Sequence, residues 1–508
     1  MRSMNSIKNT AVAMLSNLIT IVIGFVAQKA FLQTLGLEYA GLNGLFNNIV
    51  SMLAIAELGI GTAIVYHLYK PIAQKDITRI QTLMKFYKIS YRVIAGIVVV
   101  LGILVMPFLQ IIVGDTSIPE SIYAIYALFL ADTVISYLLT YKRSILYANE
   151  KNYIVNLVHI GYLIIMNGLQ IATLYIFQNI FVYLGIKVTC RFLENVVITI
   201  IANRKYAYLK EKQVKPLDKE TKTDIFTKIK GLIFHKIGAF LVLGSDNIII
   251  SMLFGVKTVG LYTNYSMIIT AIENLIGQVF SSITASIGNL LVEENSEKSY
   301  QIYKKLLFFN FVVVTFCTIA FAQLVKPFIT LIYGAEYVLP IAVALSIAVK
   351  FYFQNMRKNI NAFKEAAGVF YEDRFIPLVE VAVNIVVSVI LGKLIGLPGV
   401  FIGTAISSLV LYLYSYPKYV YIPVFKKSKL QYLKENGYYL GMMLIFFVAT
   451  EICMMCLNIT NMWALFFVGG LASIIVPSIG IWLVFRKKEE FIYFRGLVGK
   501  LFPFFRKK

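Results

Sequence analysis

The sequence has few charged residues and no long hydrophilic block. Only 15% of its 508 residues are charged, against roughly 25% in a soluble globular domain, and 59% are hydrophobic. Apolar stretches of about 20 residues, long enough to cross a bilayer, recur along the whole chain. The composition therefore predicts an integral membrane protein and excludes a separate catalytic or nucleotide-binding domain.

Cysteine and histidine are also scarce. The four cysteines all lie within apolar stretches, so no disulfide framework is predicted, and the C-x-x-C of Cys453 and Cys456 is more typical of packing than of redox chemistry. The three histidines have no second histidine or cysteine at ligand spacing, so no metal site is expected. The sequence lacks a G-x-x-x-x-G-K-[ST] loop, which argues against ATP hydrolysis by this chain. We expect no cofactor and no enzyme activity.

Positive charge, by contrast, is abundant. The chain has 48 Lys and Arg against 26 Asp and Glu, a net charge of +22. In a membrane protein such an excess mainly reflects cytoplasmic loops, with a secondary attraction to anionic membrane lipids. No basic and aromatic platform stands outside the apolar stretches, so nucleic acid is not an expected partner.

The apolar stretches predict an all-α membrane protein of about fourteen transmembrane helices. With the N-terminus inside, 41 of the 48 Lys and Arg fall in predicted inner segments or at the inner ends of the adjoining spans, which places both termini in the cytoplasm. The predicted spans are 10–35, 42–66, 90–113, 118–141, 154–177, 179–201, 231–254, 259–291, 306–333, 338–364, 375–395, 398–422, 438–457 and 463–485.

The longest hydrophilic stretch follows the sixth predicted span and suggests an internal repeat. Moving the second half back by 219 positions sets 35–52 over 254–271 and matches Gly36 with Gly255 and Gly41 with Gly260. We predict two six-helix lobes, related by a pseudo-twofold axis along the membrane normal. Chance agreement between two glycine-rich apolar stretches is the alternative. The predicted parts are an N-terminal lobe (1–202), a basic cytoplasmic linker (203–230), a C-terminal lobe (231–425), and two extra helices with a basic tail (426–508).

Three stretches of the sequence resemble a known family. They are GLEYAGLNGLFNNIVSMLAIAELGIGTAIVYHLYKPIAQKD (36–76), KIGAFLVLGSDNIIISMLFGVKTVGLYTNYSMI (236–268) and SSITASIGNLL (281–291). They resemble the Wzx-type flippases that export O-antigen and capsule repeat units in bacteria, within the multidrug/oligosaccharidyl-lipid/polysaccharide exporter superfamily. These motifs are diffuse and indicate the family better than the substrate.

The resemblance implies a two-lobed transporter in the bacterial cytoplasmic (inner) membrane. Such a transporter would move undecaprenyl-diphosphate-linked oligosaccharide from the inner to the outer leaflet by alternating access. It also implies a polysaccharide polymerase and chain-length machinery as partners.

Independent of the resemblance, ionisable residues inside the predicted spans are candidate site residues, because charge within a bilayer is costly. Lys187, Arg191 and Glu194 occur at i, i+4 and i+7 and so share one helix face. The two cations could bind a diphosphate, with Arg191 gripping its oxygens and Lys187 adding a point charge. The alternative is an Arg191–Glu194 pair that only neutralises itself.

Two further lysines and four acids complete the candidate set. Lys29 is predicted either to line a polar cavity or to reach the outer interface with its amino group. Lys350 is predicted to line a polar cavity. The acids inside spans serve either as counter-ions for the cations or as sites of H⁺ or Na⁺ coupling, and they are Glu57, Asp132, Asp246 and Glu273.

Two other functions compete with the flippase. A cation-coupled multidrug exporter of the same superfamily would favour acidic and aromatic walls over basic ones. An integral-membrane glycosyltransferase or polymerase would need a sizeable outer loop, and the outer turns predicted here are short.

Overall fold

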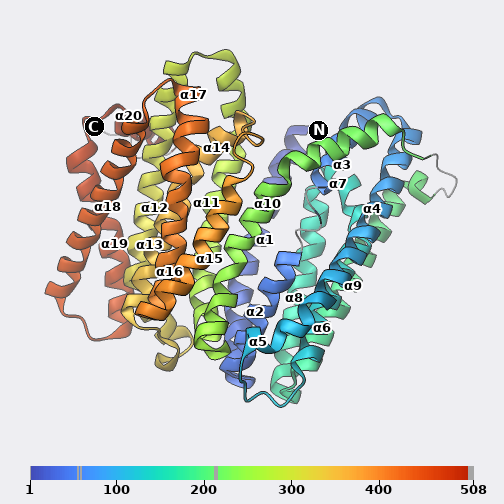
Figure 1. Ribbon diagram of the computed structural model, residues 1–508, viewed down its shortest axis with the longest axis horizontal. Coiled ribbons are helices and arrows are strands. Elements are labelled where there is room, and N and C mark those ends of the chain that lie inside the picture. Colours follow the sequence, from blue (N-terminus) through green and yellow to red (C-terminus); the bar gives the residue numbers. More distant parts are fainter. Residues whose placement is uncertain (1, 54–56, 58–59, 211–215, 502–508) are drawn as a thin grey trace. The chain divides into compact units, whose positions relative to one another are not determined.

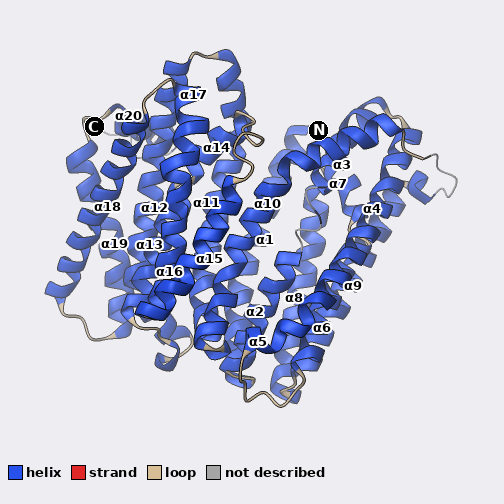
Figure 2. Cartoon of the chain, in the orientation of Figure 1, coloured by secondary structure: helices blue, strands red, loops and turns tan. Residues whose placement is uncertain are grey.

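A computed structural model describes residues 2–53, 57, 60–210 and 216–501, which are almost entirely helical (Figures 1 and 2). These described ranges contain no β-strand, and the predicted all-helical class is confirmed. Within lipid, helices satisfy every backbone hydrogen bond inside one segment. The chain forms two compact units, Met1–Thr263 and Asn264–Lys508. Parts of the predicted span 42–66, of the linker 203–230 and of the C-terminal tail lie outside the described residues.

In its described residues the first unit holds the ten helices α1 to α10, two short 3₁₀ elements, and the first turns of α11. Its elements are α1 (Arg2–Thr34), α2 (Leu37–Leu53), α3 (Ile60–Gln74), α4 (Ile77–Val105), η2 (Met106–Phe108), α5 (Leu109–Val113), α6 (Ile122–Leu138), α7 (Tyr141–Ala148), α8 (Asn152–Phe177), α9 (Ile180–Lys205), η3 (Ala207–Lys210), α10 (Lys219–Phe254) and α11 (Val256–Glu293).

The second unit holds the rest of α11 and all later helices. Its central packing pairs are α12 with α19, α15 with α16 and α13 with α16. Its other elements are α12 (Ser296–Ile332), η4 (Ala335–Tyr337), α13 (Ile341–Met356), α14 (Lys358–Ala366), α15 (Ile376–Ile395), α16 (Leu397–Val410), the π-helical η5 (Leu411–Tyr421), α17 (Ile422–Phe425), α18 (Lys429–Leu457), α19 (Met462–Phe485) and α20 (Glu489–Leu501).

Within the described residues, nine helical segments are long and apolar enough to cross a membrane, or ten if the bent pair α6–α7 is one span. The chain is therefore a multi-pass membrane protein, but the count of fourteen spans is not confirmed. The predicted span 42–66 falls on the short helices α2 and α3, and the predicted span 338–364 is divided into α13 and α14. Helix α10 already begins at Lys219, inside the stretch predicted as a linker.

Local sequence signals set several helix boundaries. Asp76 and Asp218 accept hydrogen bonds from backbone N–H groups of the first turns of α4 and α10, which is the usual role of an N-cap carboxylate. Gly36, between α1 and α2, and Gly255, between α10 and α11, have φ angles of +89° and +81°. Only glycine adopts this backbone conformation without strain, so both breaks are specified by the sequence.

These two breaks lead into a close contact between α2 and the start of α11. A Cβ atom added at Gly41 would lie 2.0 Å from the carbonyl oxygen of Val256, and one added at Gly260 would lie 2.3 Å from the carbonyl oxygen of Leu37. The sequence offset of 219 maps Leu37 onto Val256 and Gly41 onto Gly260. The two contacts are thus equivalent, and small residues allow the backbones to approach closely, as in packed membrane helices.

An ion pair between repeat-equivalent residues adjoins this contact. Glu38, which the same offset maps onto Lys257, lies 3.0 Å from the Lys257 Nζ and also accepts hydrogen bonds from Thr116 and Ser117. Burial raises the pKa of the Glu38 carboxyl group, but the hydrogen bonds from Lys257, Ser117 and Thr116 together outweigh it and lower the pKa from 4.5 to about 2. The residue lies at the N-terminus of α2, ahead of the predicted span 42–66.

We expect Gly41→Ala to destabilise the first unit, because its Cβ would overlap a backbone oxygen and force two helices apart. Overpacking of this kind costs about 1–3 kcal/mol, seen as a lower Tm of the purified protein. Gly96→Ala on α4 is the matched control, since no heavy atom lies within 4 Å of its added Cβ. An unchanged or higher Tm of Gly41→Ala would show that the close contact does not exist in solution.

The low pKa of Glu38 predicts a pH-dependent contribution to stability. Its folded pKa lies below its unfolded value, so the contribution is fully present above about pH 4.5 and is lost as the pH falls towards 2. We expect the Tm of the unmodified protein to exceed that of Glu38→Gln at pH 6, with the difference shrinking between pH 5 and pH 3. A difference that stays constant over this range would contradict the assignment.

Candidate functional site

A cluster of charged side chains lies where α9 packs against α6, α7 and α8 in the first unit. Lys187, Arg191 and Glu194 face the same side of α9, as their spacing predicts. They meet Asp132 from α6, so four of the predicted site residues come together. Glu194 has no exposed side-chain surface, whereas the side chains of Lys187 and Arg191 are 17% and 23% exposed.

Asp132 contacts both cations. Its Oδ2 lies 3.6 Å from Lys187 Nζ and its Oδ1 lies 3.4 Å from Arg191 Nε. Both distances exceed the 2.7–2.9 Å of a strong charge-assisted hydrogen bond. Lys187 also donates to the side-chain oxygen of Asn47 on α2, at 3.1 Å. Asp132 therefore neutralises part of the positive charge without saturating either cation.

Glu194 is held by three nitrogen-bearing side chains from three helices. Its carboxylate oxygens lie 3.1 Å from Arg191 Nη1, 3.2 Å from Arg143 Nη2 on α7 and 3.0 Å from His159 Nδ1 on α8. The Arg143 guanidinium also donates to Asn195, at 2.8 Å. A buried carboxylate with this many partners fixes the guanidinium of Arg191 in place.

Aromatic rings form the remaining walls around the two cations. Lys187 Nζ lies 4.7 Å from the centroid of the Phe129 ring, and Arg191 Cζ lies 4.8 Å from that of the Tyr162 ring. Both distances fall within the range of cation–π attraction. The rings stabilise the cations without neutralising their charge.

The local charge balance decides what the cluster can bind. Among the described residues, Lys187, Arg191 and Arg143 face two carboxylates, Asp132 and Glu194, which leaves one positive charge uncompensated. The observed contacts with carboxylates use two of the five N–H donors of the Arg191 guanidinium. A phosphate or diphosphate supplies the additional acceptor oxygens and negative charge that such a pair attracts.

The Arg191–Glu194 pair predicted as the alternative is present, but it is not self-contained. Glu194 divides its negative charge among Arg191, Arg143 and His159. The intrahelical pair therefore positions Arg191 without removing its charge from the cluster.

The other predicted site residues lie apart from this cluster or in the second unit. Lys29 is exposed on α1 and forms no ion pair with any described residue. Glu57 accepts a hydrogen bond from the hydroxyl of Tyr91 on α4, and no cation pairs with it in the described part of the chain. Asp246 is buried on α10 between Ser245 and Asn247, 2% exposed.

In the second unit, Lys350 Nζ lies 5.7 Å from the centroid of the Phe401 ring. Glu273 on α11 accepts a hydrogen bond from Asn355 Nδ2, at 3.3 Å. The roles assigned to these two residues remain predictions.

Sequence reasoning missed Arg143, His159 and Asn195. The predicted spans 118–141 and 154–177 place Arg143 in an inner loop. In the structure it lies on α7, a helix that is bent by 46° from α6, and its side chain contacts Glu194 in the cluster. His159 stands alone in the sequence, and its partner Glu194 lies on another helix. Only Asn195 carries a local signal, because it follows Arg191 by four residues and so lies on the same face of α9.

Comparisons with known proteins identify the family and the fold. Residues 6–287 match the family described as "Polysaccharide biosynthesis protein". No curated protein matches the sequence significantly.

Solved structures share the fold at low sequence identity. The inward closed lipid II flippase MurJ superposes with a TM-score of 0.66 and 15% identity, over 94% of this chain and 99% of its own. An inward-facing multidrug resistance MATE family transporter of the MOP superfamily has a TM-score of 0.62 and 15% identity, and the match covers 85% of this chain and 99% of that transporter. A MATE transporter of Vibrio cholerae has a TM-score of 0.55 and 14% identity, and the match covers 80% of this chain and 94% of that transporter. The fold is therefore one that transport proteins use.

We expect Glu194→Ala to destabilise the first unit strongly, because it leaves Arg143 and Arg191 close together without their shared carboxylate. Removing one partner of a buried ion pair costs about 3–5 kcal/mol. The yield of folded protein and its Tm measure the effect. Glu293→Ala, at an exposed position near the end of α11, should change neither. Equal behaviour of the two variants would remove Glu194 from its central role.

Proposed function

We propose that this chain, which belongs to the polysaccharide biosynthesis protein family, is a flippase for lipid-linked oligosaccharides. Its substrate is undecaprenyl-diphosphate-linked oligosaccharide, which it moves from the inner to the outer leaflet of the bacterial cytoplasmic membrane by alternating access. Both termini face the cytoplasm, in line with the distribution of Lys and Arg. The resemblance to Wzx-type proteins favours O-antigen or capsule repeat units as the cargo, with a polymerase and chain-length proteins acting after it.

The arrangement of Lys187 and Arg191 is the observation that carries this proposal. A lipid-linked oligosaccharide has an apolar tail, a sugar head and a diphosphate between them, and the diphosphate is the charged group that all such molecules share. The cluster offers two partly exposed cations and a net positive charge among apolar helices. Charge attraction is strong in such surroundings, because the local dielectric constant is low.

Asp132 has a defined part in this scheme. In the empty site it compensates Lys187 and Arg191 at 3.6 and 3.4 Å, which keeps two cations tolerable next to apolar helices. A diphosphate replaces these long contacts with shorter ones and competes directly with the carboxylate. Binding and release of the substrate then exchange one set of ion pairs for another, so neither state leaves an isolated charge.

The fold is compatible with a lipid substrate, but it does not by itself distinguish a lipid from a drug. One neighbour is described as a lipid II flippase and others as multidrug transporters, so the architecture serves both kinds of substrate. The charge of the site discriminates between them. A multidrug exporter that takes cationic drugs is disfavoured here, since a drug cation would be repelled by the uncompensated positive charge.

Coupling to an H⁺ or Na⁺ gradient is part of the proposal. Asp246 is the preferred coupling residue, because it is a buried acid whose neighbours in the sequence, Ser245 and Asn247, carry oxygens of the kind that ligate a hard cation. Asp132 and Glu194 lie next to cations, which favours the counter-ion role for them.

We expect Arg191→Ala to slow translocation by roughly tenfold to a hundredfold, the loss expected for one or two hydrogen bonds between charged groups. Arg191→Lys should recover only part of the rate, because a point charge replaces a bidentate fork. The measurement is translocation of a fluorescent undecaprenyl-diphosphate-linked oligosaccharide in proteoliposomes, read by quencher access to the opposite leaflet.

Lys205→Ala is the control for this experiment. It removes the same charge from the exposed last turn of α9, away from the cluster, and should leave the rate unchanged. Full activity of a folded Lys187→Ala/Arg191→Ala double variant would refute the site.

A further inference from the structure

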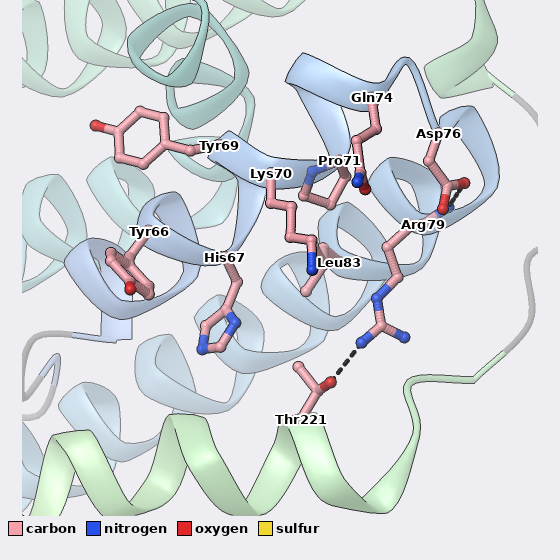
Figure 3. A pocket seen from close by; sticks show the side chains of 10 residues that line it. All are labelled: Tyr66, His67, Tyr69, Lys70, Pro71, Gln74, Asp76, Arg79, Leu83 and Thr221. Carbon is pink, nitrogen blue, oxygen red and sulfur yellow. Dashed lines mark hydrogen bonds between the residues drawn. The ribbon is translucent and has the colours of Figure 1, made fainter.

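A cavity with polar and apolar lining lies in the first unit, away from the charged cluster on α9. It has a volume of about 640 Å³ and is bounded by the end of α3, the start of α4 and the first turns of α10 (Figure 3). None of its lining residues belongs to the cluster around Glu194. The volume falls within the range of sites for small ligands.

The acidic side chains around this cavity are already engaged. Asp218 and Thr221 on the α10 side are hydrogen-bonded by the guanidinium of Arg79. The hydrogen bond from Arg79 lowers the pKa of Asp218, with a further contribution from Thr221, so Asp218 stays charged. Asp224 lies 3.1 Å from His67 Nε2. These contacts join the start of α10 to α3 and α4.

Lys70 is the one cation of the cavity lining that forms no ion pair with a described residue, because Arg79 pairs with Asp218 and His67 with Asp224. Its side chain is exposed and extends into the cavity between His67 and Arg79 (Figure 3). No carboxylate among the described residues forms an ion pair with Lys70. Asp76, the one acid among the residues that line the cavity, caps α4 by accepting a hydrogen bond from the backbone N–H of Arg79.

The rim of the cavity is aromatic and exposed. The exposed fractions of Tyr66 and Tyr69 are 62% and 51%, and Ile77, the first residue of α4, is 48% exposed. Tyrosines with this mixed character are enriched where a membrane meets water, since the ring is apolar and the hydroxyl is wet. Six of the ten lining residues, from Lys70 to Leu83, lie between the predicted spans 42–66 and 90–113, in a segment that the charge distribution assigns to the cytoplasmic side.

We propose that this cavity binds the phosphate of an anionic phospholipid headgroup of the cytoplasmic leaflet. Lys70 is the phosphate ligand, His67 and Gln74 offer further polar contacts, and the acyl chains lie along the exposed rings of Tyr66 and Tyr69. The inference rests on the proposed orientation of the chain but not on its transported substrate. A bound headgroup also spans α3 and α10, so it stabilises the contact that Arg79 makes with Asp218.

The test is a titration of the purified full-length chain with dioleoylphosphatidylglycerol, followed by native mass spectrometry. We expect Lys70→Gln to raise the Kd for the first bound lipid roughly fivefold, because that is the affinity one lysine contributes near an anionic headgroup. Lys70→Arg should bind within about twofold of the unmodified chain, which separates loss of charge from loss of fold. Lys219→Gln is the matched control, because Lys219 is exposed at the start of α10 and outside the lining.

Two probes distinguish the source of the phosphate. Dioleoylphosphatidylcholine carries a phosphate without net charge, and its binding should not depend on Lys70. Inorganic phosphate carries the charge without acyl chains, and it should not displace the phosphatidylglycerol at equal concentration.

Three results would overturn the inference. Equal weakening by Lys70→Gln and Lys219→Gln would reveal diffuse surface attraction in place of a site. Unchanged binding by Lys70→Gln would remove Lys70 as the ligand. Displacement of the lipid by equimolar inorganic phosphate would make the cavity a site for free anions. None of these readouts involves translocation, so each is independent of the flippase proposal.

Discussion

The side chain of Glu194 is fully buried in a unit built mainly from apolar helices. An isolated carboxylate there would carry a desolvation penalty of several kcal/mol, so its burial demands cationic partners with good geometry. Arg191, Arg143 and His159 supply them from α9, α7 and α8. The requirement to compensate one buried charge thus sets the packing of three helices, and it also fixes the orientation of the guanidinium that we assign to the substrate.

A second constraint applies at two helix breaks, one between α1 and α2 and the other between α10 and α11. Both breaks occur at a glycine with positive φ, and both lead to a glycine pressed against a carbonyl oxygen of the repeat-equivalent helix. Glu38 and Lys257, equivalent under the same offset of 219, form an ion pair beside them. A chance likeness between two apolar stretches would not produce reciprocal contacts at matching positions, so the geometry favours a true repeat.

Hydropathy predicted most helix boundaries within a few residues, because a membrane segment must be apolar over its own length. It did not predict the break between α13 and α14 or the helix α7, since a short charged helix looks like a loop in sequence. Helical spacing brought Lys187, Arg191 and Glu194 to one face correctly, because that relation is local. The partners Asp132, Arg143 and His159 lie on other helices. No local sequence signal indicates that Arg143 and His159 pair with Glu194, and none indicates the 46° bend at α7.

The central claim, that Lys187 and Arg191 form a diphosphate site, is tested most directly by ligand-dependent stability. Farnesyl diphosphate carries a diphosphate group on a short lipid tail, and a ligand that binds only the folded state raises the Tm by an amount that grows with its concentration relative to its Kd. The account predicts that it raises the Tm of the unmodified protein, that farnesol does not, and that the shift is lost in a folded Lys187→Gln/Arg191→Gln variant. An equal shift in that variant would show that the diphosphate binds elsewhere and would contradict the account.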